Sequence, residues 1–276
     1  MKNSGKLLII LVSILGGAVS TCPLRSDVKD SSKIEVETIP IEILSKNGKK
    51  PIIVAVIDTG FDFNSNWDSI VKNNPKIKKP KMCKYGHKDF TGIGLQDNHG
   101  HGTHIAGIIA QYALDQDYCI VVIKFYDPLL KNANFVELTD LAFKRAVDLK
   151  VDIINYSGGG TERDREECLI LKKALDRGIK VVAAAGNEGS NINEKPYYPA
   201  MCEDRIIAVA NIEKDGKYAK TSNFSDPTDV NSRKLAVQEG VNVMSLSPGN
   251  RVAIMTGTSQ AAAIETGKIV KNWKKQ

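Results

Sequence analysis

The sequence predicts an α/β fold, a three-layer α/β/α sandwich with a mainly parallel central sheet. Short apolar segments rich in β-branched residues alternate with longer segments in which apolar residues recur at helical spacing. The short segments are apolar throughout, which is typical of strands buried on both faces of a parallel sheet. Right-handed crossovers through the intervening helices then place helices on both faces of the sheet.

Five strands are expected, and each is closed by turn-forming residues. They are PIIVAVIDTG from residue 51, CIVVIKFYD from 119, VDIINYSGGG from 151, IKVVAAAG from 179 and RIIAVANI from 205. Three helices are expected between these strands, namely HGTHIAGIIAQYAL from residue 101, FVELTDLAFKRAVDLK from 135 and ECLILKKALDRG from 167. The last of them stops at Gly178, a residue type that is common just after a helix end.

The N-terminus has the layout of a secretory signal peptide. Residues 1–20 carry two lysines ahead of an apolar run, and small residues follow. Residues 21–49 are polar, which predicts an N-terminal arm or a short pro-segment, and residues 50–276 are expected to form one folded domain. The pattern therefore predicts a protein that is secreted or held in the cell envelope.

Two other fates of the N-terminus stay open. An uncleaved signal would serve as an anchor helix, and VSTC resembles a bacterial lipobox, so a lipid on Cys22 would make the chain a lipoprotein. Membrane contact is expected only through one of these two routes. Export permits disulfides, and if Cys22 is the unpaired member of the five cysteines, the other four allow three pairings.

The charge distribution does not favour nucleic acid as a partner. The net charge is +6, and the densest basic run is KIKKPK at residues 76–81. No aromatic residues interleave these lysines, whereas single-stranded nucleic acids are bound by aromatic stacking beside positive charge. We interpret the run as a surface loop.

Polar residues that could carry chemistry follow the predicted strands, where ligands bind in an open parallel sheet. Asp58 follows the first strand, Ser157 the third and Asn187 the fourth, while His101 and Ser259 lie where glycine-rich loops enter helices. Nucleophilic catalysis requires a hydroxyl, a base and an orienting carboxylate. Ser259, His101 and Asp58 supply one of each.

Four segments resemble, in order, the signature segments of the subtilisin-like serine proteases, the subtilases. These segments are VAVIDTG, HGTHIAG, AAAGNEG and GTSQAAA. The resemblance covers roughly residues 50 to 270 and implies a subtilisin-like fold and a serine endopeptidase that acts on peptides or proteins. It implies that Ser259 is the nucleophile, that His101 is the general base and that Asp58 orients His101.

The resemblance also implies binding residues. Asn187 matches the side chain of the oxyanion hole, and Ser157, Gly158 and Gly159 match the loop that pairs with an extended substrate. The loop that often holds calcium in the family has no counterpart here, so no tight metal site is expected there, although scattered Asp and Asn residues permit a weak one. No cofactor is expected. This architecture further suggests two disulfides, Cys83–Cys119 and Cys168–Cys202.

One segment departs from the family pattern and leaves other functions open. Gln260 stands where the family usually has methionine, and the usual proline nearby is absent. A catalytically silent relative that binds peptides or a protein partner is therefore the alternative function. A metal site on His99, His101 and His104 is the third hypothesis, but no acidic ligand lies at helical spacing. We expect His104 to be packed behind His101, and His99 to be exposed to solvent.

Overall fold

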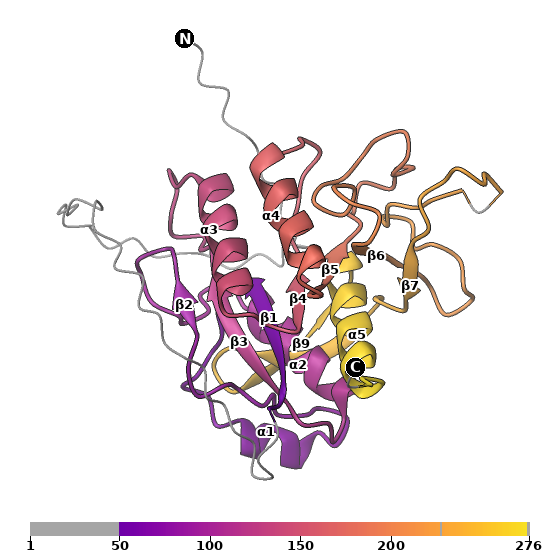
Figure 1. Cartoon of the computed structure of the whole chain (residues 1–276). Coiled ribbons are helices and arrows are strands. Elements are labelled where there is room, and N and C mark those ends of the chain that lie inside the picture. Colours follow the sequence, from indigo (N-terminus) through magenta and orange to yellow (C-terminus); the bar gives the residue numbers. More distant parts are fainter. Residues whose placement is uncertain (1–49, 227, 275–276) are drawn as a thin grey trace, which may run out of the picture.

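The computed structural model describes residues 50–226 and 228–274 (Figure 1). The predicted signal peptide, the arm up to residue 49 and Cys22 lie outside the described residues. One large sheet has seven strands in the order β2-β3-β1-β4-β5-β6-β7, and all the neighbouring strands in it run parallel. Its strands are β1 (Ile52–Asp58), β2 (Lys88–Asp89), β3 (Tyr118–Lys124), β4 (Ile153–Tyr156), β5 (Lys180–Ala184), β6 (Ile207–Asn211) and β7 (Ala236–Gln238).

The remaining elements are helices and one hairpin. The helices are α1 (Trp67–Asn73), α2 (His101–Ala113), α3 (Phe135–Asp148), α4 (Arg165–Asp176) and α5 (Thr258–Lys271). The hairpin consists of β8 (Val243–Ser247) and β9 (Arg251–Met255), which pair antiparallel. The five strands and three helices expected from the sequence are all present.

Alternating residues of the central strand β1 separate two apolar cores. Ile53 and Ile57 face a core that includes residues of α3 and α4, whereas Val54 and Val56 face a core that includes residues of α2 and α5. Helices therefore cover both faces of a sheet whose central strands are fully buried, as the continuous apolar segments predict. The prediction of a three-layer α/β/α sandwich is confirmed.

Four strands and one helix were not predicted from the sequence. Strands β2 and β7 have two and three residues, and β8 and β9 are only partly buried. Segments this short or this exposed carry too little hydrophobic periodicity to be recognised. Helix α1 has seven residues and buries only Trp67, so it also lacks a repeating apolar face.

Both disulfides suggested by the architecture are formed. Cys83 is bonded to Cys119 at the start of β3, and Cys168 of α4 is bonded to Cys202 in the segment before β6. Beside the first bond, the Cys83 N–H also donates to the Ile120 carbonyl of β3 at 2.9 Å. Within residues 50–226 and 228–274, no helix has the length and apolar character needed to cross a membrane.

Candidate active site

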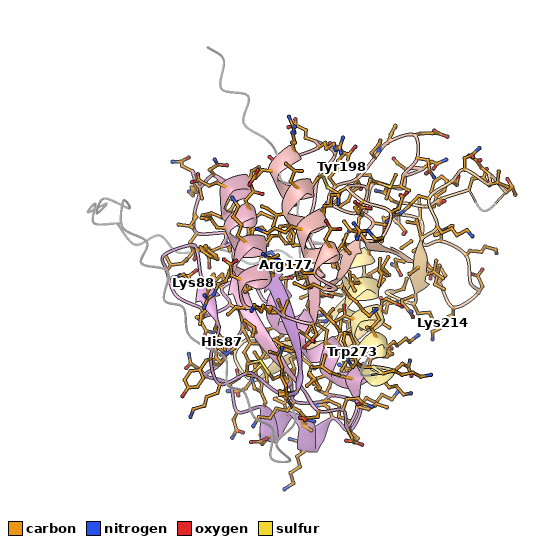
Figure 2. All side chains as sticks on the ribbon, viewed as in Figure 1. His87, Lys88, Arg177, Tyr198, Lys214 and Trp273 are labelled. Atoms are coloured by element: carbon orange, nitrogen blue, oxygen red, sulfur yellow. A yellow bond between two sulfur atoms is a disulfide. The ribbon has the colours of Figure 1, made fainter. Side chains whose placement is uncertain are left out.

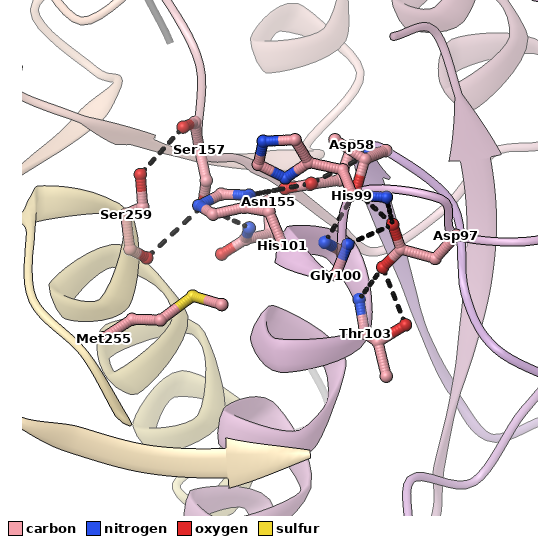
Figure 3. Close-up of polar contacts among 12 residues, drawn as sticks. Asp58, Asp97, His99, Gly100, His101, Thr103, Asn155, Ser157, Met255 and Ser259 are labelled. Atoms are coloured by element: carbon pink, nitrogen blue, oxygen red, sulfur yellow. Dashed lines mark hydrogen bonds and ion pairs between the residues drawn. The ribbon is translucent and has the colours of Figure 1, made fainter. Parts of the chain in front are cut away.

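The last residue of β1 and the first residue of α2 form a buried pair. His101 Nδ1 lies 2.8 Å from Asp58 Oδ1 and 3.0 Å from Oδ2 (Figure 3). Burial alone lowers the pKa of His101, but the charge of Asp58 and the hydrogen bond to it, together with the charge of Asp97, raise this pKa above the ordinary value. Asp58 thus holds the His101 ring by the nitrogen that faces away from any reacting group.

The start of α2 is fixed by Asp97, a residue outside the four signature segments. Asp97 Oδ1 accepts the backbone N–H of Gly100 at 2.7 Å, and Oδ2 accepts the N–H of Thr103 at 2.8 Å. Its carboxylate therefore accepts the N–H groups of the N-cap residue Gly100 and of Thr103 in the first turn, and the positive end of the helix dipole stabilises its negative charge there. The side chain of Thr59 donates to Asp97 at 2.8 Å and links this cap to the turn after β1.

Gly102 allows α2 to lie directly against that turn. Its N–H donates to Thr59 Oγ1 at 2.9 Å. A Cβ at this position would lie 2.3 Å from the Gly60 carbonyl oxygen and 3.2 Å from Asp58 Cβ. The contact between His101 and Asp58 thus depends on a missing side chain at the next position of the helix.

Ser259 is the second residue of α5 and faces the loop that follows β4. Its Oγ donates to the Ser157 carbonyl at 2.9 Å, and Ser157 Oγ donates to the Ser259 carbonyl at 3.3 Å (Figure 3). Among the described residues, Ser259 Oγ makes no hydrogen bond to His101. The serine and the histidine belong to one site, but the serine hydroxyl is turned toward Ser157.

Asn187 is bonded through the oxygen of its side-chain amide. Its Oδ1 accepts the N–H of Thr258 at 2.9 Å and the Thr258 hydroxyl at 3.2 Å. This arrangement leaves the amide Nδ2 as the group that can donate elsewhere. Because Thr258 directly precedes Ser259, the bond fixes Asn187 relative to the candidate nucleophile.

Asn223 organises the loop that carries Asn187, although it belongs to none of the four signature segments. Its Oδ1 accepts the N–H groups of Glu188 and Ser190 at 3.2 and 3.0 Å. Its Nδ2 donates to the Ala185 carbonyl at 2.9 Å and to Glu188 Oε2 at 2.7 Å. A single buried amide thus satisfies donors and acceptors on both sides of Asn187. No local signal marks Asn223, since its partners lie more than 30 positions earlier in the chain.

The loop after β4 contains the three predicted substrate-binding residues. Ser157 begins it beside Ser259, and Gly158 and Gly159 follow. At its end Gly160 exchanges backbone hydrogen bonds with Tyr198, which lies beside the start of α4 (Figure 2). A cavity between α3 and α4 adjoins Gly159 and Gly160.

The other two histidines of the cluster do not resemble a metal site. His104 is fully buried, its Nε2 lies 3.2 Å from the Ala253 carbonyl, and burial lowers its pKa to about 4. The expectation that His99 is exposed is wrong, because its ring is half-buried against His101 and Tyr126. In the described part of the chain, no three His, Cys, Asp or Glu side chains are grouped so as to hold a metal ion.

A buried Asp–His pair beside a serine at a helix start, at one edge of a parallel sheet, is the kind of site that serine peptidases use. Comparison with known proteins identifies the family. The model of the Subtilase family matches residues 49–276. The chain therefore belongs to the subtilase family and is, by class, a serine-type endopeptidase.

Several curated proteases are similar to this chain. It is 29% identical over 82% of its length to the major intracellular serine protease of Bacillus subtilis, and spans 70% of that protein. It is 30% identical to an intracellular serine protease of Paenibacillus polymyxa and 32% identical to a thermostable alkaline protease of Halalkalibacterium halodurans, over 78% and 75% of its length. The chain spans only 64% and 53% of the lengths of these two relatives.

Solved structures show the same fold at lower identity. The protease domain of PatA, solved as a mutant, has a TM-score of 0.63 at 20% identity, covering 80% of this chain and 78% of that chain. The prenylagaramide maturation protease PagA has a TM-score of 0.58 at 23% identity, covering 78% and 72%. At these identities the likeness supports the fold alone.

Proposed function

We propose that this chain hydrolyses peptide bonds within peptides or proteins, using Asp58, His101 and Ser259 as its catalytic triad. The buried contact of 2.8 Å between His101 Nδ1 and Asp58 Oδ1 carries the proposal. It fixes the tautomer of His101, leaves Nε2 to act as the base and stabilises the imidazolium that forms. Ser259 lies at the N-terminus of α5, where the helix dipole favours developing negative charge.

Substrate binding is proposed to occur along the loop Ser157–Gly159. An extended peptide would pair with backbone groups of this loop, as in strand addition to a sheet edge. In the structure, the Ser157 carbonyl accepts a hydrogen bond from the Ser259 hydroxyl. A substrate N–H that takes over this carbonyl would release the hydroxyl, which could then turn toward His101 Nε2.

The reaction then follows from the groups present. Ser259 Oγ attacks the scissile carbonyl carbon as His101 Nε2 takes its proton, and the carbonyl oxygen becomes negatively charged. Asn187 Nδ2 and the Ser259 N–H donate to this oxygen, and each such donor is typically worth about 10²–10³ in rate. His101 next protonates the leaving amine, and water hydrolyses the acyl-enzyme through the same base.

A silent relative is the second candidate, and two observations favour it. The Ser259 hydroxyl is bonded to Ser157 and not to His101, while the buried Gln260 next to Ser259 has its amide 4.0 Å from the Met255 sulfur. A site locked in this state would bind peptides without cleaving them. The two candidates differ in whether Ser259 can act as a nucleophile.

A fluorophosphonate probe separates the two functions. The protease hypothesis predicts that the probe labels the wild type and not Ser259→Ala, and that only the wild type degrades casein. Asn187→Ala should fold normally and lose about 10²–10³ in kcat. A well-folded wild type that neither labels nor cleaves casein would show that the silent relative is correct.

Export is proposed on the basis of the two disulfides. Bonds such as Cys83–Cys119 and Cys168–Cys202 persist in oxidising compartments and are rare in the cytosol. Two relatives bear the word intracellular in their names, which favours the opposite location. Sequencing the N-terminus of the protein from separate cell fractions decides between export and a cytosolic location. Exported protein beginning at Thr21, or lipid-modified at Cys22, supports export, and cytosolic protein with four free thiols in the described domain refutes it.

A further inference from the structure

The ring of Tyr197 lies between two loops of the candidate active site. Tyr197 belongs to the segment between β5 and β6 and is only 6% exposed. A Cβ placed on Gly159 would lie 2.4 Å from Tyr197 Cε1, and a Cβ placed on Gly186 would lie 2.8 Å from Tyr197 Cδ2. Since Cε1 and Cδ2 are on opposite edges of the ring, the phenyl group fills the distance from one loop to the other.

These two loops flank the candidate nucleophile. The loop of Gly159 begins at Ser157, whose carbonyl accepts the Ser259 hydroxyl. The loop of Gly186 continues into Asn187, and the Gly186 N–H donates to the Thr258 hydroxyl at 3.2 Å. The space between the loops therefore opens directly beside Ser259.

A substrate side chain has to enter this space. The scissile carbonyl carbon must lie at Ser259 Oγ, with its oxygen toward Asn187 and its chain along Ser157–Gly159. The side chain of the residue that contributes this carbonyl, here called the cleavage residue, then projects between the two loops. Tyr197 occupies the same space from inside the protein.

We propose that Tyr197 is a specificity-determining residue that closes the space between the two loops, so that the enzyme cleaves after residues with small side chains such as Gly, Ala and Ser. The inference rests on the proposed function. A large cleavage residue would have to displace a buried aromatic ring, whereas a methyl or hydroxymethyl group requires little or no movement. Protein interiors are packed too densely to accept the extra volume without a cost.

Gly159 and Gly186 leave the room that the Tyr197 ring occupies. Gly159 and Gly186 have φ angles of 152° and 102°, so a side chain at Gly186 in particular would be strained as well as in collision with the ring. Burial raises the pKa of the Tyr197 hydroxyl, and the charges of Glu188 and Glu167 raise it further. The ring is therefore neutral at all physiological pH values.

The test compares peptide anilides that differ only at the cleavage residue, Ala or Phe. For the wild type we expect kcat/KM to favour Ala by about 100-fold or more, within the range by which pocket size discriminates. In the Tyr197→Ala variant, the ratio of kcat/KM for the Phe anilide to kcat/KM for the Ala anilide should rise by at least about 10-fold. Tyr197→Phe keeps the ring and should keep the preference of the wild type.

Two results would overturn the proposal. One is a wild type that cleaves the Phe anilide as well as the Ala anilide. The other is a folded Tyr197→Ala whose Ala-to-Phe ratio is unchanged although the probe still labels Ser259. If Tyr197→Ala fails to fold, mass spectrometry of a protein digested by the wild type decides: cleavage after Gly, Ala and Ser supports the inference, and cleavage after Phe, Leu or Tyr refutes it. An enzyme that cleaves nothing and does not label refutes the proposed function itself.

Discussion

Substituting Gly102 by alanine tests how the candidate triad is assembled. A Cβ at this position would lie 2.3 Å from the Gly60 carbonyl oxygen, and this oxygen belongs to the backbone and has no rotamer to relieve the contact. An ordinary carbon–oxygen contact requires about 1 Å more than this distance. Either α2 or the turn after β1 must therefore move by about 1 Å. His101 begins α2, and Asp58 directly precedes the turn.

The expected loss of activity follows from that displacement. A misplacement of 1 Å in a catalytic constellation costs about 10²-fold in rate, which corresponds to about 3 kcal/mol in the activation barrier. We expect kcat of Gly102→Ala to fall by this factor with a smaller change in KM, because Ser157–Gly159 is not disturbed. Peptide anilide kinetics measure kcat and KM. The rate of fluorophosphonate labelling measures the reactivity of Ser259, and a thermal melt checks that the variant is folded.

Gly107→Ala is the matched control in the same helix. Its Cβ would lie 2.3 Å from Ser245 Oγ, a side-chain atom on the hairpin rather than on the turn that follows Asp58. We expect this variant to lose stability but to keep most of its kcat. If Gly102→Ala retains kcat within about threefold, and gains the roughly 1 kcal/mol that alanine provides over glycine in a helix, then close packing at Gly102 does not position the triad.

Two further predictions concern the pH profile and the disulfides. Because His101 must be neutral to accept a proton and its pKa is raised by Asp58, kcat/KM should fall as pH drops through a value above 6.5. Asp58→Asn should shift this acid limb to lower pH and reduce kcat by about 10⁴, and a limb below pH 6.5 in the wild type would contradict the argument. Replacing Cys83 and Cys119 by serine opens a loop with a sequence separation of 36, so urea unfolding should show a loss of about 4 kcal/mol, and a loss below about 1 kcal/mol would contradict a structural role.

The sequence was sufficient to predict the helices and strands that bury a repeating apolar pattern. Strands β1, β3 and β4 and helices α2, α3 and α4 were recognised because each depends on residues a few positions apart. The hairpin of β8 and β9 was not recognised, because it pairs half-exposed residues that no local pattern distinguishes from a loop. The half-buried position of His99 was also missed, since Tyr126, one of the rings that cover it, lies on another element.

The same distinction applies to the candidate site. Motif order singled out Asp58, His101, Ser259 and Asn187, and the fold brings them to one edge of the sheet. The residues that hold them in place had no such signal. Asn223 acts through partners more than 30 positions away, and Asp97 is joined to Thr59 over 38 positions. Such contacts exist only after the helices have been packed on the sheet.

By itself, then, the sequence determined the α/β class, the chemical groups of the candidate site and the family resemblance, because these depend on residue types and on spacing along the chain. Only the tertiary structure decided that the Ser259 hydroxyl is bonded to Ser157, 102 positions earlier, and that the Tyr197 ring separates Gly159 from Gly186. The physical reason is that hydrogen bonds and steric contacts are set by distances of a few ångströms in space. The sequence fixes such distances only locally, whereas between remote segments the packing of the two cores fixes them.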